Sequence, residues 1–295
     1  MPRAKVNNIE IEYETFGNAS GKPLLLVNGL GSQMINWDEG FIKLLIDHGF
    51  YVIRFDNRDV GLSTKCEDAG EPNLRQKLIA AQSGEPVESP YSLDDMADDA
   101  VGLLDFLNIE KAHICGISMG GMIVQTITIR HPSRVLSLTS IMSTTGNPDL
   151  PQPSPEVLQA LITPVPPERD AVIENAVKVG RMIYGSGFSY DEAKARKLAG
   201  MAFDRCFYPT GFARQLLAIL AHGNRKPKLS SLKVPTLVIH GDDDPLVPVE
   251  GGRDTAEAII GSELIIIKGM GHGLAPETWG QISDAIAKKA VKAYV

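Results

Sequence analysis

The stretch HICGISMGGMIV (residues 113–124) contains one serine, Ser118, among three glycines in an otherwise apolar run. The residues before it are typical of a buried strand, and MIVQTITIRH (122–131) has the pattern of a helix that Pro132 ends. A buried strand or helix normally carries bulky side chains here, so glycine indicates a backbone that needs space or an unusual conformation. The sequence therefore predicts a sharp strand–turn–helix corner, of the form G-x-S-x-G, that exposes the Ser118 hydroxyl.

Similar buried runs recur along the 295-residue chain and alternate with helical patterns. Residues 5–15 have the pattern of a half-exposed hairpin or an edge strand, and the buried strands predicted after them are 23–29, 51–59, 111–118, 135–143, 235–244 and 263–269. The clearest helix begins with a capping box formed by Ser92 and Asp95, and the last helix covers roughly 279–294. Apolar strands that alternate with helices are typical of a mostly parallel, doubly wound sheet, so we predict an α/β fold.

One segment, residues 144–230, interrupts this alternation. It begins rich in proline and continues with helical patterns such as 170–184 and 191–205, without a buried-strand run. The proline-rich start favours a rigid connection over a ligand-binding tract. We therefore predict a core made of residues 1–143 and 231–295, into which residues 144–230 are inserted as a mostly helical cap.

A serine hydroxyl is a weak nucleophile and needs a base nearby. His272 lies in GMGHGLAP (269–276), a glycine-rich loop after the last predicted strand, where it can reach the carboxyl edge of the sheet. The other histidines have structural interpretations: predicted helix ends for His48 and His131, apolar strands for His113 and His240, and the end of the insertion for His222. We therefore predict that His272 is the base.

Such a base needs a carboxylate that orients its ring and stabilises the imidazolium. HGDDDPLVP (240–248) follows the preceding strand and offers Asp242, Asp243 and Asp244. We favour Asp244 because it directly precedes Pro245, which fixes the chain after it, whereas the other two are suited to shaping the turn. No acidic residue directly follows the strand at 135–143, the other location considered.

Acyl transfer also needs N–H donors for the oxyanion of its tetrahedral intermediate. Met119 supplies one at the start of the helix after Ser118, and Leu30 in VNGLGSQ (27–33) is placed to supply the second. The glycines around Leu30 also resemble a dinucleotide-binding turn, but that fingerprint requires glycine where Met34 stands. The sequence therefore favours an oxyanion loop, and we predict no cofactor and no metal.

A polar turn, FDNRDVGLS (55–63), follows another predicted strand. Its Asp56, Arg58 and Asp59 are open to two interpretations, an acid–base cluster or an ion-paired brace beside the oxyanion loop. We favour the brace.

Composition and charge argue against several classes of protein. The net charge of −7 does not suit the clustered basic surface of a nucleic-acid-binding protein. Three irregularly spaced cysteines support neither a disulfide framework nor a zinc site. The N-terminus lacks the apolar core of a signal peptide, and no apolar run reaches membrane-spanning length. We expect a cytoplasmic protein that acts on a small molecule and not on a membrane, with its oligomeric state, a homo-oligomer included, left open.

Taken together, the motifs resemble the α/β-hydrolase superfamily over nearly the whole chain. In order they are the NG-x-G loop, DNRDVGLS, GISMGG, HGDDDPLVP and GMGHGLAP, and the order Ser–Asp–His is that of the superfamily. The D-x-R-D-x-G-x-S turn, GSGFSYDEA (185–193) and GMGH are similar to the aclacinomycin methylesterase-like bacterial carboxylesterases. The resemblance implies these roles: Ser118 as nucleophile, His272 as base, Asp244 as orienting acid, and the amides of Leu30 and Met119 as oxyanion hole.

We therefore expect a cofactor-independent serine carboxylesterase that forms an acyl-enzyme. The same residues also suit perhydrolysis with cofactor-free haloperoxidase activity, C–C bond hydrolysis, or a non-enzymatic ligand receptor on a hydrolase scaffold. Haloalkane dehalogenases and epoxide hydrolases are disfavoured because they use aspartate where Ser118 stands. One departure is Asn28-Gly29, where many relatives carry His-Gly. Backbone donors act in this loop, so the departure concerns its geometry rather than the mechanism.

Overall fold

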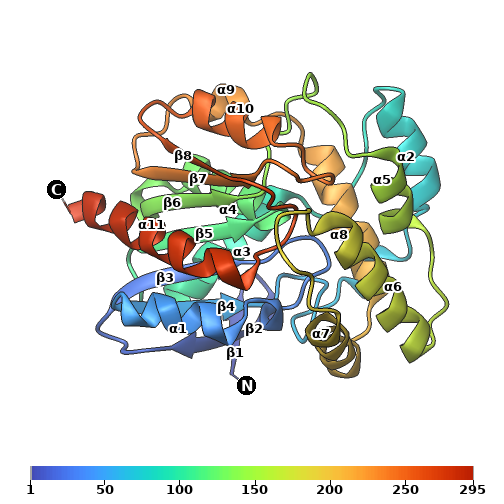
Figure 1. Cartoon of the computed structure of the whole chain (residues 1–295), viewed down its shortest axis with the longest axis horizontal. Coiled ribbons are helices and arrows are strands. Elements are labelled where there is room, and N and C mark those ends of the chain that lie inside the picture. The colour runs from blue at the N-terminus through green and yellow to red at the C-terminus, as the bar shows by residue number, and fades with distance from the viewer. Residues whose placement is uncertain (1, 295) are drawn as a thin grey trace.

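The buried runs form one eight-stranded sheet in the computed structural model, which describes residues 2–294 (Figure 1). The strands are β1 (Arg3–Val6), β2 (Ile9–Phe16), β3 (Lys22–Val27), β4 (Phe50–Phe55), β5 (Ala112–Ile117), β6 (Val135–Ile141), β7 (Thr236–Gly241) and β8 (Glu263–Ile267). Their order across the sheet is β1-β2-β4-β3-β5-β6-β7-β8. The β1–β2 and β2–β4 pairs are antiparallel and the other pairs are parallel, which confirms the predicted mostly parallel α/β sheet.

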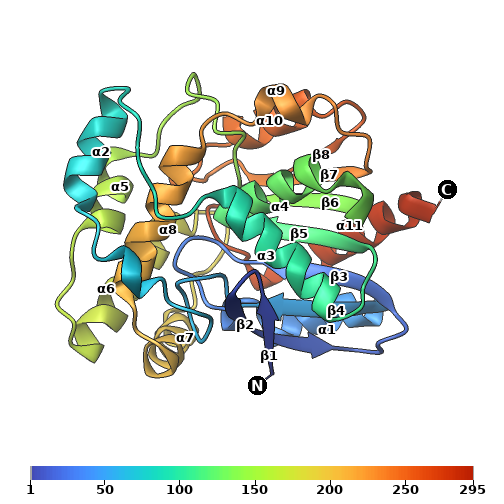
Figure 2. The same ribbon diagram turned by 180° about the vertical axis from the view of Figure 1, so that it is seen from behind.

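Helices cover both faces of this sheet and one of its ends (Figures 1 and 2). They are α1 (Glu39–Asp47), α2 (Leu74–Gln82), α3 (Leu93–Phe106), α4 (Met119–Arg130), α5 (Pro155–Ile162), α6 (Arg169–Ile183), α7 (Glu192–Arg205), α8 (Pro209–His222), α9 (Lys226–Leu229), α10 (Glu250–Ala258) and α11 (Trp279–Val291). The apolar residues of α3 and α4 form one core with the sheet, and those of α1 and α11 form a second core on the opposite face. The predicted capping box of α3 is present, with both Ser92–Asp95 hydrogen bonds formed.

The register of the parallel strands brings the predicted functional loops together. Val27 of β3 pairs with Gly116 of β5, so the loop that follows β3 lies beside the corner that follows β5. Gly241 of β7 pairs with Ile267 of β8, which places the aspartate turn beside the histidine loop. The carboxyl ends of parallel strands meet at one edge, the usual location of ligand sites in open α/β sheets.

The segment between β6 and β7 is helical, as predicted: within residues 144–230, all of which are described, no strand occurs. Its helices α5 to α8 lie at the end of the sheet together with α2, which precedes α3 in the chain (Figures 1 and 2). The incoming and outgoing connections run side by side, because a Cβ on Gly146 would overlap the Gly223 carbonyl oxygen. Arg225 joins them further, donating from its backbone N–H to Thr145 O at 2.8 Å and from Nη2 to Thr144 O at 2.8 Å.

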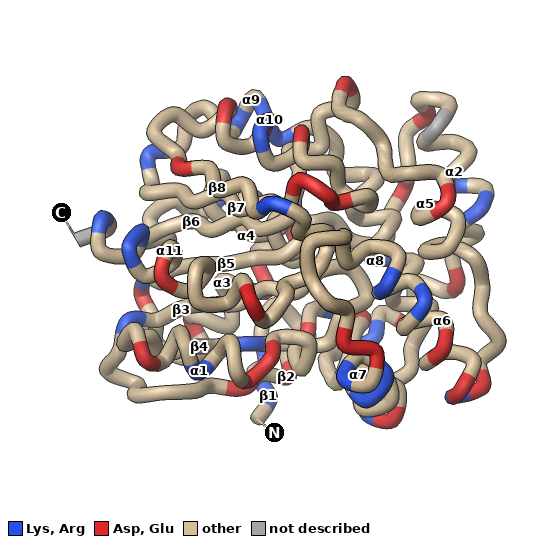
Figure 3. The backbone as a smooth tube through the Cα atoms, viewed as in Figure 1, with Lys and Arg blue, Asp and Glu red and all other residues tan. Residues whose placement is uncertain are grey.

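Ion pairs on the outer surface connect α6 to α7, where Figure 3 shows charges of both signs on α7. Arg196 of α7 bonds Glu174 of α6, and Arg169 of α6 lies 2.7 Å from Asp204 of α7. These side chains are substantially exposed, so the pairs contribute little to stability and mainly fix how the two helices align.

Candidate active site

Ser118 occupies the sharp corner between β5 and α4, as the glycine pattern predicted. Its φ of 55° and ψ of −120° lie outside the regions that most non-glycine residues adopt. The neighbouring glycines leave space for the backbone: a Cβ on Gly116 would overlap the Gly120 carbonyl, and a Cβ on Gly120 would overlap Val27 O. The bulk missing from this stretch is therefore occupied by backbone, which is how the turn becomes tight enough to expose the hydroxyl.

The corner is also fastened to the end of β6. The Ser118 N–H donates to Ile141 O at 2.9 Å, and Ser143 Oγ donates to Ser118 O at 2.8 Å. A Cβ on Gly121 would overlap the Ser143 side chain, so the third glycine allows this close approach. The strained conformation of Ser118 is thus held by two hydrogen bonds to the end of β6 and the residues that follow it.

His272 and Asp244 meet at the same edge of the sheet, beyond β8 and β7. His272 Nδ1 lies 2.7 Å from Asp244 Oδ2, with 8 % of the His272 side chain and none of the Asp244 side chain exposed. Because the carboxylate only accepts, Nδ1 carries the donated proton and Nε2 is left free to take up another. No hydrogen bond joins Ser118 Oγ to His272 in the part of the chain that the structure describes. Such bonds are often long without substrate.

The environment of Asp244 keeps its carboxyl ionised. Burial alone would raise the pKa of this group, but the charge of His272 and hydrogen bonds from His240, His272 and the Val247 N–H hold the pKa well below its usual value. The second oxygen, Oδ1, accepts from the N–H groups of Leu246 and Val247 at 2.9 Å each. A fixed anion is therefore available to orient His272 and to stabilise its imidazolium form.

His240 is a residue of this site that the sequence interpretation missed, because its place in an apolar strand indicated a core role. Its buried ring donates from Nε2 to Val247 O at 2.8 Å, and Nε2 lies 3.5 Å from Asp244 Oδ2. The available signal was its position four residues before the acid, at the end of β7. His240 and His272 thus both approach the same carboxylate oxygen, Asp244 Oδ2, with His272 the closer of the two.

The three consecutive aspartates have separate partners. Asp242 Oδ1 accepts from the Gly269 N–H at 2.6 Å, and Asp243 Oδ2 accepts from the Ser186 N–H at 2.6 Å. Of the three, Asp244 is the one that bonds His272. Asp242 does shape the turn, whereas Asp243 reaches the insertion.

The loop after β3 lies directly against the serine. A Cβ on Gly29 would lie 3.2 Å from Ser118 Cβ and 3.8 Å from Ser118 Oγ, so the backbone here approaches the hydroxyl closely. The Gly31 N–H donates to Gln215 Oε1 at 2.8 Å, and this bond fixes the loop directly after Leu30, the predicted oxyanion donor. Met119 is the first residue of α4, and its N–H therefore lacks an intrahelical partner.

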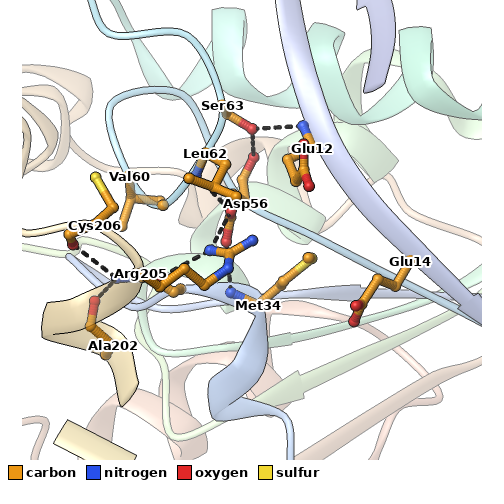
Figure 4. Close-up of polar contacts among 12 residues, drawn as sticks. Glu12, Glu14, Met34, Asp56, Val60, Leu62, Ser63, Ala202, Arg205 and Cys206 are labelled. Carbon is orange, nitrogen blue, oxygen red and sulfur yellow. Dashed lines mark hydrogen bonds and ion pairs between the residues drawn. The ribbon is translucent and has the colours of Figure 1, made fainter. Parts of the chain in front are cut away.

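The polar turn after β4 forms the ion-paired brace, because its charged groups are all paired. Figure 4 shows Asp56 and Arg205, which lie 2.7 Å apart at the end of α7, and Asp56 also accepts from the Met34 N–H at 2.7 Å. The other pairs are Arg58 with Asp99 at 2.7 Å and Asp59 with Arg214 at 2.7 Å. The brace connects the loop after β3 to the insertion.

A cavity of about 460 Å³ lies between the insertion and the loop after β3. Most of its lining is apolar and comes from α6, α7 and α8, including Leu198, Phe203 and Phe212. Gly31 and Ser32, the two residues that follow Leu30, also line the cavity.

Two features are absent from residues 2–294. Those residues contain no group of three or more His, Cys, Asp or Glu side chains arranged to hold a metal ion. Among the helices formed by the same residues, none combines the length and apolar character needed to cross a bilayer.

Comparisons with known proteins agree with this architecture. Residues 22–277 match the profile of the alpha/beta hydrolase fold family. The chain is 29 % identical to the rhodomycin D methylesterase DnrP of Streptomyces peucetius and 26 % identical to DauP, the methylesterase of the same name from Streptomyces sp. (strain C5), over 93 % of each chain in both cases. The meta-cleavage product hydrolase CumD of Pseudomonas fluorescens IP01 has a similar structure, with a TM-score of 0.76, 22 % identity, and 99 % of this chain and 98 % of that chain covered. The methylesterase-like resemblance is thereby confirmed, and the chain belongs to the α/β-hydrolase fold family.

Proposed function

We propose that the protein is a serine carboxylesterase that works through Ser118, His272 and Asp244. The observation that carries this proposal is the His272–Asp244 hydrogen bond of 2.7 Å at the sheet edge where β5 presents Ser118 on a strained corner. The similarity to two proteins named as methylesterases supports an ester as substrate. A Ser–His–Asp arrangement performs acyl transfer without a cofactor.

In the proposed reaction, Ser118 Oγ attacks the ester carbonyl carbon while His272 Nε2 takes the hydroxyl proton. The N–H groups of Leu30 and Met119 stabilise the oxyanion, and such a donor typically lowers the barrier by about 3 kcal/mol. The C–O bond breaks, and the alcohol leaves with the proton from His272. Water then loses a proton to His272 and attacks the acyl carbon, which releases the carboxylic acid and regenerates the serine.

We also propose that residues 144–230 act as a cap over a core of residues 1–143 and 231–295. The cavity supports this role, because its largely apolar lining includes Gly31, the residue after the proposed oxyanion donor Leu30. Esters with an extended apolar acyl or alcohol group would fill about 460 Å³ better than acetate esters do. A series of p-nitrophenyl esters of increasing chain length measures this preference.

The decisive experiment is the substitution Ser118→Ala. We expect hydrolysis of a p-nitrophenyl ester to fall by about 10⁶-fold, because the nucleophile is lost while binding and the oxyanion donors remain. Circular dichroism melting serves as the control for folding. Unchanged hydrolysis in a folded variant contradicts the proposal.

Assays on the wild-type protein distinguish ester hydrolysis from the other functions that this fold supports. Fluorophosphonate labelling of Ser118 followed by multiple-turnover kinetics distinguishes an enzyme from a receptor, which labels but does not turn over. Parallel assays with peroxide and with a C–C cleavage substrate compare the rival reactions, and esters should give the highest kcat/KM.

A further inference from the structure

The loop between α6 and α7 lies against the loop that carries His272. We call residues 183–187 the cap loop and residues 268–273 the base loop. Three backbone hydrogen bonds join them: His272 N to Ile183 O at 2.5 Å, Gly271 N to Tyr184 O at 2.9 Å, and Gly187 N to Gly269 O at 2.9 Å. The peptide N–H of His272 itself is thus bound by the last residue of α6.

Glycines on both sides allow this contact to form between backbones. A Cβ on Gly271 would overlap Ile183 O, and a Cβ on Gly185 would overlap the Gly271 nitrogen. A Cβ on Gly187 would lie 2.7 Å from Gly269 Cα, closer than any real Cβ contact. The GSG of the cap loop and the GMG of the base loop are therefore matched surfaces, which gives a physical reason for two glycine-rich motifs far apart in the sequence.

Asp243 connects the same two loops from the side of the acid. Its Oδ2 accepts from the Ser186 N–H at 2.6 Å, and its own N–H donates to Met270 O at 3.1 Å. The next residue, Asp244, bonds His272. The acid turn, the base loop and the cap loop therefore form a closed ring of hydrogen bonds, with the His272–Asp244 bond as one of its links.

We propose that the cap loop positions His272, and that Gly271 and Asp243 are positioning residues for the base. The inference rests on the proposed function, in which His272 is the base. Three glycines in the base loop give its backbone wide conformational freedom, and the bonds to the cap loop remove that freedom. A displacement of about 1 Å can cost about 100-fold in rate, so the cap controls the chemical step as well as substrate binding.

The first test is Gly271→Ala, which pushes the cap loop away from the base loop. We expect kcat for p-nitrophenyl acetate to fall about 100-fold with KM changed less than about threefold, because the small ester makes little use of the cap. Gly280→Ala is the matched control, because nothing lies within 4 Å of a Cβ at that position of α11, and it should keep the wild-type kcat. A wild-type kcat in folded Gly271→Ala overturns the proposal, as does a raised KM at unchanged kcat.

Asp243 provides a second test that does not crowd the backbone. Asp243→Ala removes the acceptor for the Ser186 N–H and should lower kcat about three- to tenfold, whereas Asp243→Asn keeps an acceptor oxygen and should recover most of the rate. Equal losses in both variants, or no loss in either, contradict a positioning role.

A spectroscopic measurement tests the position of His272 without an activity assay. The Nδ1 proton shared between His272 and Asp244 should give a low-field NMR resonance, assigned by its loss in His272→Ala. In Gly271→Ala that resonance should broaden or disappear, and in Gly280→Ala it should persist. A sharp, unshifted signal in Gly271→Ala overturns the inference. If wild-type protein hydrolyses no ester, the proposed function fails, and the resonance still tests the positioning.

Discussion

Asp242, Asp243 and Asp244 are chemically identical side chains whose partners lie in different parts of the molecule. They bond, in order, the base loop, the cap loop and the imidazole of His272. The third alone is buried, and its lowered pKa follows from burial being outweighed by the charge of His272 and several hydrogen bonds. Position along a turn, rather than residue type, therefore assigns the role of each acid.

The exchange Asp244→Asn tests that assignment. The asparagine amide would donate to Nδ1, so the imidazole would carry its proton on Nε2 and could not accept one from Ser118. We expect kcat to fall about 10⁴-fold. Steady-state kinetics on a p-nitrophenyl ester measure the effect. Asp242→Asn, which keeps an acceptor for Gly269, is the matched comparison and should stay close to wild type.

At the scale of elements, α8 is the helix that ties the insertion to the core. Arg214 bonds Asp59 through Nε and Nη2 at 2.7 and 2.8 Å. Gln215, the next residue, donates to Arg58 O at 2.8 Å while it accepts from Gly31. The buried face of α8 therefore carries two polar side chains, Arg214 and Gln215, and they hold the loops that follow β3 and β4.

Loss of the Arg214 guanidinium should destabilise the protein strongly. In Arg214→Met the Asp59 carboxylate stays buried without its ion pair, and we expect the free energy of unfolding to fall by about 3–5 kcal/mol in urea titrations. The double variant Asp59→Asn/Arg214→Met should recover part of this loss. Arg196→Met, at the exposed α6–α7 pair, should lower the free energy of unfolding far less. Equal losses in the two single variants would contradict the argument.

At the scale of the whole molecule, two histidines couple folding to pH. Burial, followed by the charge of Lys22, lowers the pKa of His113 in β5 to about 4. Burial, followed by the charge of Arg225, lowers the pKa of His222 at the end of α8 to about 4 as well. One group lies in the sheet and the other at the junction with the insertion, so both parts of the fold respond to acid.

The sign of the effect follows from proton binding. An unfolded histidine titrates near pH 6.5, so between about pH 6.5 and 4 the unfolded chain binds more protons than the folded chain, and stability falls as pH falls. We expect each group to remove about 2 kcal/mol between pH 7 and pH 5. Urea titrations at the two pH values should show a smaller difference in His222→Gln than in wild type. An unchanged difference would refute the assignment.

Much of this architecture could be predicted from the sequence because it depends on local pattern. Apolar runs gave the strands, and the glycines around Ser118 gave the corner, since each reflects backbone geometry within a few residues. The insertion's bonds to the core could not be found in this way. Arg214 and Asp59 are 155 positions apart, and no periodicity pairs them. The same holds for the contact between Ile183 and His272 and for the packing of His240 against Asp244.

The adjacent connections of the insertion, joined by Arg225, have a consequence for evolution and design. Gly146 lies against the Gly223 carbonyl, so the two ends of segment 147–222 are close together in space. A foreign helical module could be grafted there without stretching the sheet. We expect the graft to need a glycine-containing loop that packs against GMG at 269–271. A module chosen only for its new pocket would leave the base loop without this contact, and the resulting enzyme would be slow.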